Sequence, residues 1–153
     1  MIKVASLPVE EVSSGDYPEL IELWEASVRA THSFLTEDDI RFYRSLILNS
    51  YFALVDLKCV RNARGRILGF IGTTPEKIEM LFIHPDARGM GIGRQLVRYA
   101  VDVLNIKRVD VNEQNDQAVG FYYAVGFRLG KRSPIDGMGK PYPMLHMLID
   151  QDN

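Results

Sequence analysis

Three glycines at alternate positions, Gly89, Gly91 and Gly93, follow Arg88 and stand directly before a helix-like run. Glycine adopts backbone conformations that other residues resist, and its lack of a side chain lets a bulky ligand approach the main-chain N–H groups. Successive N–H groups ahead of a helix form an anion-binding nest, to which the helix dipole adds partial positive charge. The stretch therefore predicts a site for a phosphate or pyrophosphate group.

Two common phosphate-binding motifs do not fit this stretch. A P-loop ends in Gly-Lys-Ser/Thr, whereas Gly93 is followed by Arg94 and Gln95. A dinucleotide fingerprint reads G-x-G-x-x-G, and the position of its third glycine is occupied by Leu96. The pattern that remains is R-x-x-G-x-G, beginning at Arg88.

A second stretch, 112–127, reads NEQNDQAVGFYYAVGF and carries two adjacent tyrosines. On a helix, Asn115, Ala118 and Tyr122 are spaced by three and four residues and share one face. Tyr123 is rotated about 100° from its neighbour and points elsewhere. The spacing therefore predicts that Asn115 and Tyr122 act on the same side of this helix.

Helices and strands must alternate along the chain to position these two stretches. Hydrophobic periodicity and capping residues predict helices at 16–30, 36–48, 92–104 and 115–126, with Asp16 and Thr36 as N-caps and Gly126 as a C-cap. Strands are expected at 2–7, 51–60, 66–72, 77–83, 106–112, 127–131 and 143–149, and Gly65 indicates a hairpin between the second and third. This order, βααβββαβαββ, predicts one α/β (α+β) domain over residues 1–153, with a mixed central sheet flanked by about four helices.

Composition excludes several classes of protein. The 153 residues carry 18 basic and 20 acidic side chains, and this balance argues against a nucleic-acid partner. The chain begins without an apolar signal region and has no run of about 20 apolar residues, so neither secretion nor membrane insertion is expected. Its single cysteine, Cys59, favours a core position and a reducing compartment, which makes the expected location cytoplasmic. Three scattered histidines predict no metal site.

The segments Glu79–Val97 and Asn112–Phe127 resemble two motifs of the GNAT superfamily of N-acetyltransferases. The first matches the signature Q/R-x-x-G-x-G/A, which holds the pyrophosphate of coenzyme A. The second matches a helix that an Asn opens and that F-Y-x-x-x-G-F closes. The stretches RATHSFL, VNEQNDQAVGFY and GKPYPML further resemble a subgroup of small bacterial acetyltransferases of the YjaB type.

This resemblance implies a GNAT fold, with a sheet that splays at the cofactor site, and transfer of acetyl from acetyl-CoA directly to a primary amine. It assigns Tyr122 as the acid that protonates the leaving thiolate. Glu79, two residues before Leu81 and expected on the same strand face, is the candidate base, directly or through a water. The cofactor-binding residues that it implies are Leu81, Phe82, Ile83, Arg88, Gly89, Met90, Gly91, Ile92, Gly93, Arg94 and Asn115.

The acceptor is a small-molecule or peptide amine that the sequence leaves unidentified: a peptide N-terminus, a lysine side chain, a polyamine or a drug-like amine. In GNAT proteins an early helix–helix loop and a late strand connection border the acceptor. The corresponding residues are Trp24, His32, Phe34, Asp136, Met138 and Tyr142, of which Asp136 is suited to a cation. The chain is expected to be a monomer or a homodimer.

Competing interpretations accompany these assignments. Tyr122 alternatively is a core tyrosine, and Glu79 a solvated strand residue. For the whole chain, one alternative is a non-catalytic acyl-CoA-binding sensor of the same fold. Another is a nucleotide-binding protein, which would bind ATP or NAD better than coenzyme A.

Overall fold

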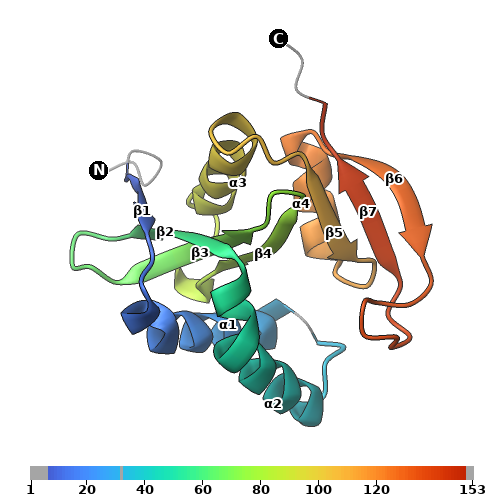
Figure 1. Cartoon of the computed structure of the whole chain (residues 1–153), viewed down its shortest axis with the longest axis horizontal. Coiled ribbons are helices and arrows are strands. Elements are labelled where there is room, and N and C mark those ends of the chain that lie inside the picture. Colours follow the sequence, from blue (N-terminus) through green and yellow to red (C-terminus); the bar gives the residue numbers. More distant parts are fainter. Residues whose placement is uncertain (1–6, 32, 151–153) are drawn as a thin grey trace.

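The computed structural model describes residues 7–31 and 33–150. Its helices and strands follow one another in the predicted order βααβββαβαββ: β1 (Val9–Glu11), α1 (Tyr17–Thr31), α2 (Glu37–Leu46), β2 (Asp56–Arg61), β3 (Ile67–Thr73), β4 (Ile78–Ile83), α3 (Ile92–Asp102), β5 (Arg108–Asn112), α4 (Asp116–Val125), β6 (Arg128–Ser133) and β7 (Met144–Leu148). The prediction of a mixed sheet flanked by four helices is confirmed (Figure 1).

The sheet has the strand order β1-β2-β3-β4-β5-β7-β6. Neighbouring strands are antiparallel except β4 and β5, which are parallel and share a single residue pair, Ile78 with Val109. Because that pair lies at the start of both strands, β4 and β5 diverge toward their carboxyl ends. This divergence, called the fork below, is the splay expected at the cofactor site.

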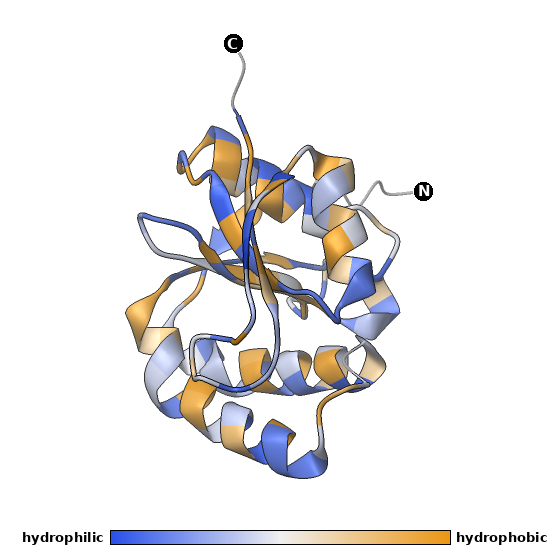
Figure 2. Cartoon of the chain, turned by 90° about the vertical axis from the view of Figure 1, so that its right-hand side faces the viewer, coloured by the Kyte–Doolittle hydropathy of each residue, from blue (hydrophilic) through white to orange (hydrophobic). Residues whose placement is uncertain are grey.

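Two hydrophobic clusters cover opposite faces of the sheet. The first packs α3 and α4 against inward side chains of β2 to β5 and β7, including Val109, Val111 and Met147. The second packs α1 and α2 against β2 to β4, with Phe70 completely buried. The helix pairs lie above and below the sheet in Figure 1, and Figure 2 shows apolar bands alternating with polar ones along them. Within the described residues, β5, β6 and β7 contribute nothing to the second cluster.

Helix ends follow the predicted capping chemistry in two of three cases. The Thr36 side chain accepts a hydrogen bond from the Asp39 backbone N–H at 3.0 Å, so the N-cap of α2 is confirmed. Gly126 ends α4 with φ 121°, a value that favours glycine. The N-cap at Asp16 is wrong, because residues Ser14–Asp16 form a short 3-10 turn that runs straight into α1, and the Asp16 carboxylate binds Arg61.

Two strand predictions differ from the structure. Residues 51–54 belong to helical turns that extend α2, so β2 begins only at Asp56 and not at Tyr51. The first strand, expected at 2–7, falls almost entirely outside the described residues, and the observed first strand is β1. The hairpin at Gly65 is confirmed, with φ 83° and its N–H bonded to the Asn62 carbonyl at 3.0 Å.

Candidate functional site

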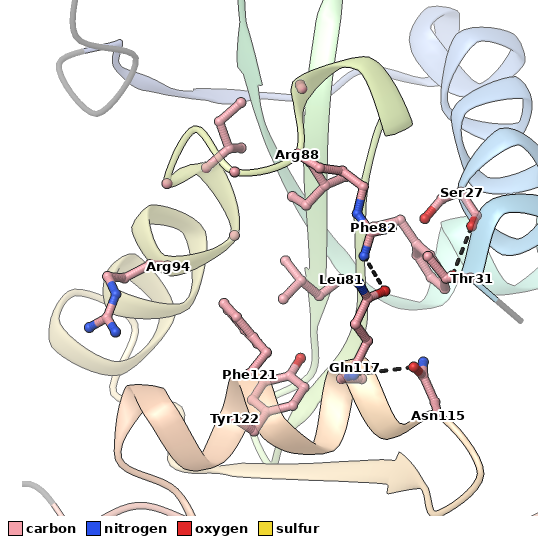
Figure 3. Close-up of a pocket in the computed structure, with 17 residues that line it drawn as sticks. Ser27, Thr31, Leu81, Phe82, Arg88, Arg94, Asn115, Gln117, Phe121 and Tyr122 are labelled. Atoms are coloured by element: carbon pink, nitrogen blue, oxygen red, sulfur yellow. Dashed lines mark hydrogen bonds between the residues drawn. The ribbon is translucent and has the colours of Figure 1, made fainter.

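A cavity of about 450 Å³ opens at the fork. Four segments meet there: α1, the end of β4, the glycine turn leading into α3, and the start of α4 (Figure 3). Its lining consists of Ser27, Thr31, Leu81, Phe82, Ile83, Ala87, Arg88, Gly89, Gly91, Ile92, Gly93, Arg94, Asn115, Gln117, Ala118, Phe121 and Tyr122. Of the residues predicted to bind cofactor, all but Met90 line this cavity.

The glycine turn has the backbone geometry that the sequence suggested. Gly89 and Gly91 have φ values of 79° and 84°, and Gly91 is the N-cap of α3, so main-chain N–H groups of the first helical turn stand open beside it. A Cβ on Gly91 would meet no atom within 4 Å, so the backbone conformation rather than crowding demands glycine there. The exposed Met90 side chain lies outside the cavity lining.

Gly93 serves a different purpose from the other two glycines. A Cβ there would lie 3.3 Å from the Phe121 ring, so glycine lets α3 pack closely against α4. The guanidinium of Arg88 reaches the same helix and donates a hydrogen bond to the Gln117 side-chain oxygen (Figure 3). That of Arg94 hydrogen-bonds to the Ala124 carbonyl at 3.4 Å.

Tyr122 projects from α4 into the cavity, whereas its neighbour Tyr123 is 47% exposed on the other side of the helix. The predicted difference in facing is therefore confirmed. The Tyr122 ring packs between Phe121 and Phe127, at centroid distances of 5.1 and 5.4 Å. Burial raises the pKa of Tyr122 above its ordinary value, so the hydroxyl keeps its proton throughout the physiological range.

The hydroxyl of Tyr122 points toward the cavity in Figure 3, and the described residues give it no hydrogen-bond partner. Asn115, one turn earlier, caps α4 by accepting the Ala118 N–H at 3.2 Å and lines the same cavity. A hydroxyl that opens on the cavity beside an anion nest, on an otherwise buried ring, is suited to donate a proton to a bound group.

Glu79 does not lie where the sequence placed it. Thr73 pairs with Ile78 but Gly72 pairs with Met80, so Glu79 is the extra residue of a β-bulge. The bulge breaks the alternation of side chains, and the expectation that Glu79 shares a face with Leu81 is wrong. Its carboxylate is exposed, accepts the Thr74 hydroxyl at 2.9 Å and is absent from the cavity lining.

The predicted acceptor residues that the structure describes lie outside the cavity lining, and only some of them are brought together. Phe34 packs against Tyr142 at 5.8 Å between ring centroids, and the Tyr142 hydroxyl donates to Asp39 at 3.2 Å. The Asp136 carboxylate is used within its own loop, where it accepts the N–H groups of Met138 and Lys140, both at 2.9 Å.

The remaining acceptor predictions have separate outcomes. Trp24 is 3% exposed and packs edge-on against Phe82, so it belongs to the core beneath the cavity. The Met138 sulfur accepts a hydrogen bond from the Tyr51 hydroxyl at 3.7 Å. His32 lies outside the described residues.

One polar cluster was missed by the sequence analysis. The hydroxyl of Ser133 lies 2.7 Å from His146 Nε2, and His146 Nδ1 lies 2.7 Å from Asp110 Oδ1. The other oxygen of Asp110 binds Lys77 Nζ at 2.5 Å. These four residues come from four parts of the chain and line a second cavity, of about 950 Å³.

Three further features of the described residues concern the thiol, metal-ligating side chains and membrane-spanning helices. Cys59 is completely buried, and burial raises the pKa of its thiol to about 11, which keeps it un-ionised. Residues 7–31 and 33–150 contain no group of three or more His, Cys, Asp or Glu side chains arranged for a metal ion. No helix among them is both long and apolar enough to cross a bilayer.

Comparison with known proteins identifies the family to which the chain is related. A sequence model of the family described as the acetyltransferase (GNAT) domain matches residues 50–129. The chain is 41% identical to peptidyl-lysine N-acetyltransferase YjaB of Escherichia coli, over 84% of this chain and 87% of that protein. It is 27% identical to peptidyl-lysine N-acetyltransferase YiaC of the same organism, over 79% of this chain and 83% of the relative.

Solved structures agree with these relatives. The solution structure of apo YjaB from Escherichia coli superimposes with a TM-score of 0.84 at 36% identity, covering 97% of each chain. The PaiA N-acetyltransferase of Thermoplasma acidophilum, solved in complex with coenzyme A, superimposes with a TM-score of 0.73 at 20% identity, over 92% of this chain and 98% of that one. The second likeness concerns the fold alone.

Proposed function

The chain belongs to the GNAT family of acetyltransferases and is an acetyl-CoA-dependent N-acetyltransferase, and we propose that the amine it acetylates is the side chain of a lysine in a protein or peptide. The observation that carries this acceptor is the 41% identity to a peptidyl-lysine N-acetyltransferase, which extends over 84% of the chain. Transfer takes place in the cytoplasm in this proposal, consistent with the single buried thiol.

The residues of the fork cavity fit coenzyme A. The left-handed glycines leave open N–H groups at the start of α3 for the pyrophosphate, and Arg88 adds a guanidinium. Leu81 and Ile83 lie beyond the last residue pair of β4 with β5, so their main-chain groups on that edge are available to the pantetheine arm. Acetyl-CoA supplies the thioester, whose acyl carbon is open to attack by an amine.

In the proposed reaction the amine nitrogen attacks the carbonyl carbon of the thioester, a C–N bond forms and the C–S bond breaks. The electron pair of that bond goes to sulfur, and Tyr122 donates its proton there. The hydroxyl of the buried Tyr122 ring supports this role, because it holds its proton and opens on the cavity. Main-chain N–H groups at the fork are candidates for stabilising the oxyanion.

Glu79 remains one candidate for the base that deprotonates the acceptor ammonium. Its place on the bulge puts Glu79 outside the cofactor cavity. Burial lowers the pKa of Lys77, but the contact with Asp110 and the negative charges nearby, including that of Glu79, outweigh burial, so this pKa lies above its ordinary value. Glu79 is therefore close to Lys77, near the end of the fork at which β4 and β5 join. Phe34, Asp136, Met138 and Tyr142 are proposed to border the acceptor, on the side of α2 and the β6–β7 connection.

A peptide assay tests the acceptor directly. The enzyme is incubated with acetyl-CoA and a peptide that has a blocked N-terminus and one lysine, and free thiol and peptide mass are followed. The matched peptide with arginine in place of lysine, a lysine-free peptide with a free N-terminus, and spermidine are the comparisons. Acetylation of the lysine peptide in preference to these three supports the proposal.

Two other results would change the assignment. Stabilisation by acetyl-CoA without transfer to any amine would indicate the acyl-CoA-binding sensor. A larger stabilisation by ATP or NAD than by acetyl-CoA would indicate a nucleotide-binding protein.

A further inference from the structure

The hydrogen-bonded chain from Lys77 through Asp110 and His146 to Ser133 begins at the fork. Ile78 and Val109 form the single residue pair between β4 and β5. Lys77 directly precedes Ile78 and Asp110 directly follows Val109, so both stand at the point where the two strands start to separate. From Asp110 the chain crosses to β7 and then to the end of β6.

These side chains lie on the face of the sheet that α1 and α2 cover elsewhere. Val109 and Val111 of β5 pack under α3 and α4, as do Leu145 and Met147 of β7. Alternation along each strand therefore turns Asp110 and His146 to the opposite face. That face of β5, β7 and β6 has no apolar cover from the described part of α1 or α2, and all four residues line the second cavity.

The cofactor cavity is also accessible to an acceptor from this same face of the sheet. The cofactor cavity is lined not only by α3 and α4 but also by Ser27 and Thr31 of α1, which lies on the α1 and α2 side. The cavity thus reaches through the fork to that side. The β6–β7 connection lies on that side too, through the contact of Tyr142 with Phe34.

The hydrogen bonds among Lys77, Asp110, His146 and Ser133 determine which of these groups can accept a proton. Lys77 and His146 both donate to Asp110, and these hydrogen bonds outweigh the opposing effect of burial, so the pKa of Asp110 lies below its ordinary value and the carboxylate is ionised. An ionised carboxylate can only accept, so the 2.7 Å contact places a proton on Nδ1 of His146. In the neutral form of this imidazole, Nε2 carries a lone pair and accepts the hydrogen bond of the Ser133 hydroxyl.

We propose that Ser133, His146 and Asp110 form the proton relay that deprotonates the acceptor ammonium. The ammonium gives a proton to Ser133 Oγ while the Ser133 hydroxyl proton passes to His146 Nε2. The neutral amine then attacks the thioester carbon to form the C–N bond, the C–S bond breaks with its electron pair going to sulfur, and Tyr122 protonates the thiolate. The nitrogen loses its second proton as the amide forms, and that proton restores the Tyr122 hydroxyl through solvent. The His146 imidazolium returns its extra proton to solvent. Ser133 is the residue that touches substrate, and Asp110 and Lys77 are positioning residues.

The relay works among several charged neighbours. On β6, Lys131 is the residue directly opposite His146 in the sheet. Glu79 on β4 acts on Lys77, which directly precedes the same strand. The second cavity also contains Glu76 before β4 and, before or on β5, Lys107 and Arg108. The positive charges near the cavity repel the positive charge of the acceptor ammonium. This repulsion favours loss of the ammonium proton before the amine attacks.

The test is the pH dependence of kcat/KM for the lysine peptide between pH 6 and 10, and it rests on the proposed acetyl transfer. His146→Gln is expected to lower kcat/KM about 10²-fold at pH 7, within the usual range for general acid–base catalysis. The loss should shrink toward pH 10, because a lysine amine with an ordinary pKa of about 10.4 then loses its proton unaided. The KM for acetyl-CoA should not change. Ser133→Ala is expected to show a smaller loss with the same pH dependence.

Two controls separate a relay from a structural contact. His84→Gln removes a histidine that contacts Arg66 outside both cavities and should leave the profile unchanged. Glu79→Gln tests the competing base. An equal loss at every pH in His146→Gln, no loss at all, or a pH-dependent loss confined to Glu79→Gln would overturn the relay.

A spectroscopic measurement keeps the inference testable without turnover. The ¹⁵N shifts of His146 in the free enzyme should show a protonated Nδ1 and an unprotonated Nε2, and the reverse tautomer would overturn the relay. If the wild type acetylates another amine but no lysine peptide, the acceptor assignment fails, and the same pH profile with that amine still decides the relay.

Discussion

Replacing Tyr122 by Phe removes one oxygen atom from the cofactor cavity and almost nothing else. The ring, which packs between Phe121 and Phe127, remains in place. A net protein hydrogen bond is worth roughly 0.5–1.5 kcal/mol, and the described residues give this hydroxyl no partner to lose. We therefore expect the free energy of unfolding to change by less than about 1 kcal/mol.

The effect on turnover should be much larger than the effect on stability. General acid catalysis is typically worth 10²–10⁴-fold. A thiolate is a fair leaving group, so the low end of this range applies, and kcat should fall about 10²-fold, equivalent to about 2.7 kcal/mol of transition-state stabilisation. The affinity for acetyl-CoA should stay within a few-fold, because the nest and the fork are untouched.

Tyr123→Phe provides the matched control, since the same change is made one residue away on the exposed side of α4. Its turnover should equal that of the wild type. Steady-state kinetics of both variants, with circular dichroism to check folding, decide the matter. Equal turnover in wild type and Tyr122→Phe would refute the general acid, and a large loss in Tyr123→Phe alone would mean that the wrong helical face has been assigned.

Three further predictions concern the rest of the molecule. Acetyl-CoA at about 100 times its Kd should stabilise the wild type by roughly 2.7 kcal/mol. Gly91→Glu should abolish the resulting shift in Tm, because it strains the left-handed N-cap of α3 and places a negative charge in the anion nest. A full shift in that variant would contradict binding at the nest. Tyr142→Ala should raise KM for the acceptor and leave the affinity for acetyl-CoA, measured by calorimetry, unchanged, since the Tyr142 side chain joins the β6–β7 connection to Phe34 and to Asp39 of α2. A normal KM for the acceptor would exclude these loops from the site. Asp110 has a lowered pKa, so its contribution to stability is complete above its unfolded value near 3.8 and is lost as pH falls through the folded value; Asp110→Asn should flatten this acid limb in urea titrations, and an unchanged limb would refute it.

The sequence was informative wherever one segment determines its own structure. Gly89 and Gly91 demand a left-handed turn, and Thr36 caps its own helix, so the glycine turn and α2 could be located without knowing any partner. The facing of Tyr122 and Tyr123 follows from helical geometry alone. These are local properties, and they hold in the structure.

Features that depend on strand pairing could not be predicted in this way. The bulge at Glu79 exists only because β3 and β4 pair in a register that leaves one residue over, and neither strand shows this by itself. The polar chain of Ser133, His146 and Asp110 requires β7 to insert between β5 and β6, an order that differs from the order along the chain. Trp24 fits both a core face and a pocket, and packing against Phe82 decided for the core.

The two proton transfers place opposite demands on their groups, and the fork keeps these groups in different surroundings. An acid must hold its proton until sulfur needs it, and Tyr122 is only 5% exposed, with its pKa raised by burial. A base must be free of its proton and must exchange it with solvent, and the side chain of His146 is 30% exposed and held by an ionised carboxylate. The sheet separates Tyr122 from His146, so the acid can be buried while the base remains accessible to solvent. The profile of kcat/KM against pH is therefore expected to rise on the acid side and stay level near pH 10, where an ordinary tyrosine would begin to ionise; a decline there that Tyr122→Phe abolishes would show that burial does not protect the acid.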